Sequence, residues 1–213
     1  MGLTLKEVLY TFEKIEKKIT YYKQFLNELD AIIGDGDHGT NLSKGFKVAK
    51  EKVKDKEFKD WGDIFRTVGM AILSNVGGAS GPLYGTAFMK ASMIGKEKVE
   101  INIEDFRDIL KVSIDGIKMR GKSEKGDKTM LDALIPAYEE INYGIENKLS
   151  VLNTLKNSVE AARNGVEYTK LIVASKGRAL YLGDKSIGHQ DPGATSSLII
   201  LEVIFDTVNE LRN

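Results

Sequence analysis

Residues 30–40, DAIIGDGDHGT, separate two segments of helical periodicity and contain three aspartates and three glycines. Before this stretch, apolar residues from Leu5 to Ile19 recur at steps of three and four, which predicts a helix over 3–29. After it, a second helix is expected over 39–54. The stretch is therefore a connection between helices, and its composition suits either an ordinary turn or a site for a cation.

The same periodicity continues along the rest of the chain, and no segment alternates with a period of two for long enough to predict a strand. Pro192 lies where the last helix would begin, a position that tolerates proline. Short connections between helices favour antiparallel neighbours. We therefore expect one all-α domain over 1–213, an eight-helix up-and-down antiparallel bundle or barrel, whose further helices span about 60–74, 80–95, 103–120, 129–142, 150–174 and 192–211.

Alternate connections differ in composition. Four of them, 30–40, 74–85, 120–130 and 175–196, are rich in glycine and carry Asp, Ser, Thr, Arg or His in various combinations. The connections between them are plain charged spacers. Because odd-numbered connections of an up-and-down bundle lie at the same end, the four glycine-rich loops should converge on one rim. That rim is the predicted functional site.

Composition excludes several classes of protein. The chain has 31 basic and 31 acidic residues, so no basic surface indicates a nucleic acid or a membrane as partner. It has no cysteine, which excludes disulfides, thiolate metal sites and cysteine nucleophiles. The N-terminal segment is charged and amphipathic, unlike a secretory signal, and the longest apolar run is too short to span a bilayer. A cytoplasmic protein is expected.

The residues of the four loops suit a metal-bound phosphate compound. Asp30, Asp35 and Asp37 offer the oxygen ligands that Mg²⁺ prefers, and two ions could share them. Ser80, which follows two glycines, and residues 38–41 open predicted helices, where free backbone N–H groups and the helix dipole favour an anion. Arg178 offers a planar cation for phosphate. Together they predict a metal–nucleotide site.

Each of these residues also has a purely structural interpretation. Aspartate and glycine are common in turns, and Asp127, Thr129 or Asp191 could serve only as helix caps. Met130 could belong to the core, the nucleotide pocket or both. His38 and His189 could be surface residues. Convergence of four such loops makes the structural interpretations together less probable than a site.

Four segments resemble one known family. DAIIGDGDHGTNLSKGF, GGASGPLYGTAF, RGKSEKGDKTMLDAL and GRALYLGDKSIGHQDPGATSS are similar to the signature segments of the dihydroxyacetone kinase L subunit, the ADP-binding subunit of the phosphotransferase-system-dependent enzyme. The resemblance covers essentially the whole chain. It implies an eight-helix barrel with Mg–ADP at one rim, in agreement with the loop argument.

The resemblance also implies residue roles and partners. Asp30, Asp35 and Asp37 would bind Mg²⁺, and no side chain of this chain would bond covalently to substrate. ADP would be phosphorylated in place by a phosphohistidine protein, the M subunit, and the γ-phosphoryl group passed to dihydroxyacetone on a K subunit. We expect a homodimer. The implied nucleotide contacts are His38, Gly39, Thr40, Asn41, Ala79, Ser80, Gly121, Met130, Arg178, Asp191, Pro192 and Gly193.

Two alternatives stay open at this point. The chain could work with free, exchanging ATP, as the related ATP-dependent dihydroxyacetone kinases do. It could also be a nucleotide-sensing module, since L subunits can bind a transcriptional regulator. The ketose or polyol substrate would be chosen by the partner.

Overall fold

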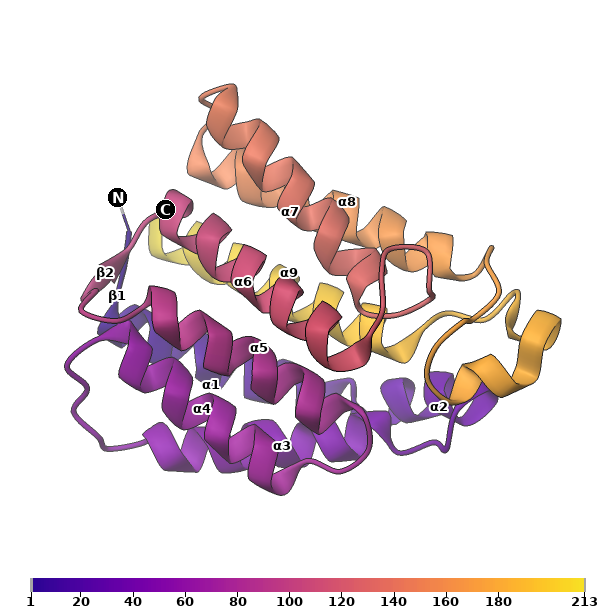
Figure 1. The fold of residues 1–213 in the computed structure, drawn as a ribbon. Helices are drawn as coiled ribbons and strands as arrows, with labels where there is room; N and C mark the ends of the chain where they lie inside the picture. The colour runs from indigo at the N-terminus through magenta and orange to yellow at the C-terminus, as the bar shows by residue number, and fades with distance from the viewer. Residues whose placement is uncertain (1, 213) are drawn as a thin grey trace.

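The computed structural model describes residues 2–212, and helices account for most of them (Figure 1). The predicted all-α fold is confirmed, and most predicted boundaries lie within a few residues of those observed. The helices are α1 (Leu5–Tyr21), α2 (Lys23–Ile33), α3 (His38–Val53), α4 (Trp61–Asn75), α5 (Ser80–Ile94), α6 (Ile103–Gly121), α7 (Leu131–Glu146), α8 (Val151–Thr169) and α9 (Pro192–Arg212), with a 3₁₀ helix, η1 (Arg178–Ser186), before α9.

Two predicted helices need correction. The helix expected over 3–29 is divided at Tyr22, and its second part, α2, continues to Ile33. The break is slight, because the Tyr22 N–H still donates to the Lys18 carbonyl and the Tyr22 carbonyl accepts from the Leu26 N–H. The helix expected over 150–174 ends at Thr169, where the chain turns toward η1.

The helices form a closed ring. From α3 to α9 each helix packs on the next, and α1 packs on both α3 and α9. The apolar faces predicted from the periodicity point inward, and Ile19, Leu26, Leu42, Ile72 and Ile141 are fully buried in one continuous core. Burial of these side chains is the main favourable term for the barrel.

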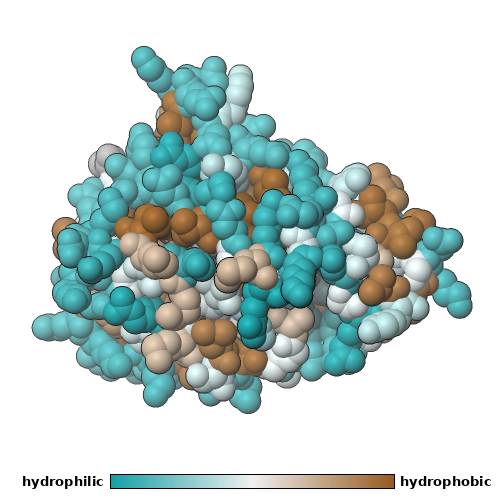
Figure 2. Space-filling view, in the orientation of Figure 1, coloured by the Kyte–Doolittle hydropathy of each residue, from teal (hydrophilic) through white to brown (hydrophobic). Residues whose placement is uncertain are grey.

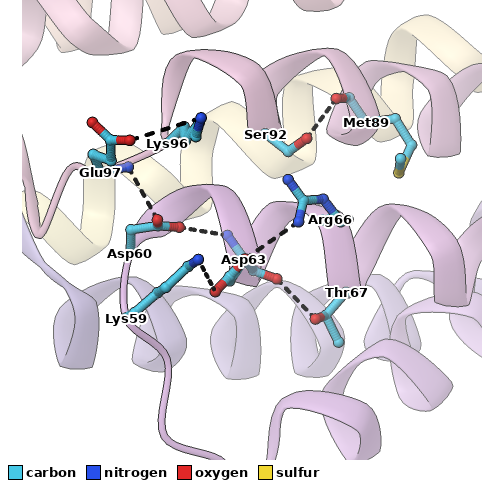
Figure 3. A network of polar contacts seen from close by, with 9 residues as sticks. All are labelled: Lys59, Asp60, Asp63, Arg66, Thr67, Met89, Ser92, Lys96 and Glu97. Atoms are coloured by element: carbon cyan, nitrogen blue, oxygen red, sulfur yellow. Dashed lines mark hydrogen bonds and ion pairs between the residues drawn. The ribbon is translucent and has the colours of Figure 1, made fainter.

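One end of the barrel holds both termini (Figure 1). A two-residue antiparallel pair, β1 (Leu3–Thr4) with β2 (Glu100–Ile101), lies there, and both strands are too short to show an alternating pattern. At the same end the Asp60 carboxylate accepts hydrogen bonds from the Asp63 and Glu97 N–H groups, which fastens the start of α4 to the end of α5 (Figure 3).

The four glycine-rich connections gather at the opposite end, beside α2 and η1 (Figure 1). The loop-parity prediction is thus confirmed by the topology. Among residues 2–212, no helix has both the length and the apolar character needed to cross a membrane.

Candidate functional site

A cavity of about 380 Å³ opens at this end, and all four glycine-rich connections contribute to its wall. Twelve of the fifteen residues predicted for the site line it. They are Asp30, Asp35, Asp37, His38, Ala79, Ser80, Gly121, Met130, Arg178, Asp191, Pro192 and Gly193.

The other three, Gly39, Thr40 and Asn41, lie one step further along α3 and are not on the wall. Gly39 is buried where α3 crosses α2, and a Cβ there would lie 2.1 Å from the Lys23 carbonyl oxygen. Thr40 exchanges two hydrogen bonds with the Asn27 side chain. The Asn41 side chain lies beside the glycine pair at the start of the 77–80 turn. The structure therefore gives Gly39 and Thr40 packing and bonding partners of their own.

The three aspartates come together at the junction of α2 and α3. Each offers a carboxylate oxygen, and these oxygens lie within 4.8 Å of one another. Asp30 lies in the last turn of α2, and one of its oxygens accepts from the N–H groups of Asp37 and His38 at 2.9 and 3.2 Å. Capping of α3 thus uses one Asp30 oxygen. The set of three carboxylates fits a hard divalent cation such as Mg²⁺.

Arg178 reaches this cluster from η1. Its Nη2 lies 2.7 Å from an Asp35 carboxylate oxygen, although the two residues are 143 positions apart. Ile33 on α2 packs against Ala174 and Ala179 in a small apolar cluster, which holds η1 over α2. The Arg178 side chain is about two-thirds exposed, so the ion pair adds little stability, but it sets a cation beside the carboxylates.

His38 belongs to a chain of hydroxyl groups under the cavity. Its Nε2 lies 2.9 Å from the Ser196 Oγ, and the Tyr84 hydroxyl lies 2.8 Å from the same oxygen and 3.0 Å from the Ser197 Oγ. Burial lowers the pKa of His38, while Asp30 and Asp37 act in the opposite direction. Burial also raises the pKa of Tyr84 to about 12. Both pKa shifts favour the neutral forms of these two side chains.

Two long helices begin at the cavity wall. α5 starts at Ser80, and α9 starts at Pro192, directly after Asp191. The Asp191 carboxylate accepts from the Ala194 N–H at 2.7 Å, so it caps α9 as the structural interpretation expected. Burial, with Asp132 and Asp30 nearby, raises the pKa of Asp191 to about 7. Free N–H groups in the first turn of α5 favour an anion. At α9, Pro192 has no N–H and the Ala194 N–H is bonded to Asp191.

Known proteins are similar to this chain along nearly its whole length. The family model described as the DAK2 domain matches residues 32–206. The chain belongs to the DAK2 domain family. Among curated relatives, the ADP-binding subunit DhaL of the PEP-dependent dihydroxyacetone kinase of Escherichia coli is 41% identical over 96% of this chain and 97% of its own length. The ADP-binding subunit of the PTS-dependent dihydroxyacetone kinase of Lactococcus lactis is 36% identical over 97% of this chain and 99% of its own.

Two solved structures of one dihydroxyacetone kinase share the fold. The dihydroxyacetone kinase of C. freundii in its native form gives a TM-score of 0.75 at 23% identity, over 97% of this chain and 35% of that one. The same kinase in complex with AMP-PNP and Mg²⁺ gives 0.72. The probable dihydroxyacetone kinase of Dictyostelium discoideum is also longer, and this chain matches 30% of its length.

Three polar residues near the cavity were not among the predicted ligands, although Asp127 was noted as a possible helix cap. Asp132 is buried in the first turn of α7 and accepts from the N–H groups of Gly126 and Thr129 at 2.6 and 2.8 Å. Asp127 bonds to Ser175, which joins two of the four loops. Lys128, between them, is fully buried. Asp132 bonds within its own loop, whereas the Asp127–Ser175 bond and the burial of Lys128 depend on segments far apart in sequence, for which the sequence gives no local signal.

For Met130 the sequence left open whether it belongs to the core, to the candidate pocket or to both. It is buried in the core and also lines the cavity, so it contributes to both.

Proposed function

We propose that this chain is the ADP-binding subunit of a phosphoenolpyruvate-dependent dihydroxyacetone kinase. The observation that carries the proposal is the convergence of three carboxylates, one arginine and two helix starts on a single cavity. Similarity over nearly the full length to subunits of that name supports it. We further propose that ADP stays bound, is phosphorylated in place by a phosphohistidine M subunit, and passes the phosphoryl group to a K subunit.

Each group of the chain has a definite part in this proposal. Asp30, Asp35 and Asp37 would hold one or two Mg²⁺ ions, which when bound neutralise charge on the phosphoryl group. The backbone at the start of α5, from Ser80 onward, would bind phosphate oxygens. Arg178, which is paired with Asp35, would add a further positive charge beside the metal when Asp35 also binds the metal. Positioning and charge neutralisation of this kind account for most of phosphoryl-transfer catalysis.

The partner must approach the same end of the barrel, because the phosphoryl group has to reach an acceptor held on another subunit. Figure 2 shows hydrophobic residues gathered at the right-hand end, over the segment between α8 and α9. Leu171, Leu180, Tyr181 and Ile187 of that segment are exposed, Tyr181 by 88%. We place the contact with the K subunit on this apolar rim, which is defined by those four residues.

The first test is nucleotide content. Freshly purified protein should release about one ADP per chain on denaturation, and prolonged chelator treatment before denaturation should remove it. Protein that is empty but binds ATP reversibly would instead support an ATP-dependent kinase subunit. Protein that binds no nucleotide under either condition would refute the proposal.

A variant tests the metal cluster directly. Asp35→Asn removes one carboxylate charge, so ADP affinity in the presence of Mg²⁺ should fall by at least about tenfold in titration calorimetry. Affinity in EDTA should change little. Asp184→Asn is the matched control, because Asp184 is an exposed aspartate of η1 at the same end and is not on the cavity wall. Equal Mg²⁺-dependent affinity in Asp35→Asn and wild type would remove Asp35 from the site.

A further inference from the structure

Lys128 lies in the α6–α7 connection, and its ammonium group occupies an unusual environment. Among residues 2–212 it is the only lysine in the buried set, with 1% of its surface exposed. Its Nζ donates to the backbone carbonyls of Thr169, Ser186 and His189 at 2.5–2.7 Å, and the Ile172 carbonyl lies at 3.4 Å. No carboxylate of these described residues is bonded to it. An ammonium has three N–H donors, so the three close carbonyls use all of them.

This arrangement argues against the usual role of a lysine beside a phosphate site. Lys128 borders the cavity, but its donors all point away from it, toward backbone carbonyls. A phosphate could be bound only if those bonds were broken. The Thr169 carbonyl would then lose its hydrogen bond and the Ser186 carbonyl would keep only that from the His189 N–H at 3.4 Å, which is costly for buried groups. Direct phosphate contact is therefore disfavoured.

The four carbonyls belong to the segment that completes the site. Thr169 ends α8, and its carbonyl is one that a helix end leaves without a partner. Ser186 ends η1, and His189 comes two residues before Asp191. The Asp191 N–H in turn donates to the Thr169 Oγ1 at 3.1 Å. Lys128 thus joins the end of α8, the end of η1 and the start of α9 at one point.

We propose that Lys128 is a positioning residue that acts as a tethered monovalent cation, holding residues 170–191 in the conformation that completes the nucleotide site. The part of this inference that concerns nucleotide rests on the proposed function; the part that concerns the conformation of residues 170–191 does not. A cage of backbone carbonyls is also how proteins replace the hydration shell of K⁺. Removing the lysine side chain should therefore leave a cage that a small free cation can enter.

The first experiment uses nucleotide-free protein and does not depend on what the site binds. In Lys128→Met, amide hydrogen exchange in 170–191 should be at least about tenfold faster than in wild type, while α3 and α4 keep wild-type rates. ADP affinity should fall in the same variant. Methionine has a Cβ, as lysine does, so the positive φ of 61° at this position gives no new strain. Lys125→Met is the control. Lys125 is an exposed lysine of the same loop as Lys128 and is paired with Glu139 on α7, so this variant should show wild-type exchange and ADP affinity.

The second experiment distinguishes a cation cage from packing alone, and it covers the case in which Lys128→Met is poorly folded. In Lys128→Ala, ammonium or potassium chloride should restore exchange protection in 170–191 and raise the melting temperature. Tetramethylammonium chloride at the same ionic strength should not, because that ion is too large for the cage. Equal effects of ammonium and tetramethylammonium, or wild-type exchange in Lys128→Met, would overturn the inference. If wild-type protein does not bind ADP at all, the proposed function is refuted. The hydrogen-exchange result would still test the role of Lys128 in holding residues 170–191.

Discussion

The buried carboxyl group of Asp191 should make the stability of the nucleotide-free protein depend on pH. Its pKa is about 7 in the folded state, because burial and two neighbouring carboxylates disfavour the charged form. In the unfolded chain a normal value near 3.9 applies. The folded protein therefore binds this proton more tightly than the unfolded chain does. Stability from this group is present below about pH 4, falls as the pH rises, and is fully lost above about pH 7.

The size of the effect follows from the difference between the two pKa values. A difference of about three units corresponds to about 4 kcal/mol over the whole range. Between pH 5 and pH 8.5, where measurement is practical, the same relation gives a loss of about 3 kcal/mol. Asp191→Asn keeps a side-chain oxygen for the Ala194 N–H but cannot ionise. Relative to wild type, the variant should therefore be more stable at pH 8.5 than at pH 5 by about 3 kcal/mol.

Urea unfolding in EDTA at the two pH values measures this difference. Comparing variant with wild type cancels other titrating groups, including His38, whose lowered pKa acts in the opposite direction over the same range. Asp206→Asn, an exposed substitution on the same helix, controls for the loss of one charge from α9. A difference between Asp191→Asn and wild type that is the same at pH 5 and pH 8.5 would refute the assignment of a raised pKa to Asp191.

Two further predictions separate the two ends of the barrel. Asp60→Ala removes the cap of α4 and the bond to the Glu97 N–H, so the free energy of unfolding should fall by about 1–2 kcal/mol, while ADP affinity measured by calorimetry stays at the wild-type value (Figure 3). A parallel loss of ADP affinity would contradict the independence of the two ends. Tyr181→Ala on the apolar rim should leave ADP affinity unchanged but lower the rate of dihydroxyacetone phosphorylation in a coupled assay with K and M subunits. An unchanged rate at limiting K subunit would show that Tyr181 is not part of the contact with that subunit.

The helices could be predicted because their signal is local. Apolar residues three and four apart mark the face that is later buried, and in the run from Leu5 to Ile19 the side chains of Phe12, Ile15 and Ile19 lie inside as expected. The division at Tyr22 could not be predicted in the same way. No proline or glycine lies near it, and the apolar repeat continues from Ile19 to Leu26 across the break.

The end of α8 shows a second limit of local patterns. Apolar residues continue past Thr169, so periodicity extends the predicted helix to 174. In the structure the Thr169 carbonyl is satisfied by Lys128, a residue of another loop. A lysine within the sequence GDKT reads as an exposed loop charge, because its burial depends on carbonyls 41 to 61 residues further along the chain. Such a helix end is fixed by tertiary contact, which a local pattern does not contain.

The aspartates show why a turn and a metal site need not be competing interpretations. Asp30 uses one carboxylate oxygen to cap α3, and that bond fixes the direction in which the carboxylate faces Asp35 and Asp37. A carboxylate held by backbone N–H groups loses less freedom when a cation binds than a free side chain would. Asp191, which caps α9 at the cavity wall, follows the same rule. Residues that are favoured in caps and turns therefore lie on the cavity wall, because in this fold the helix ends position the candidate ligands.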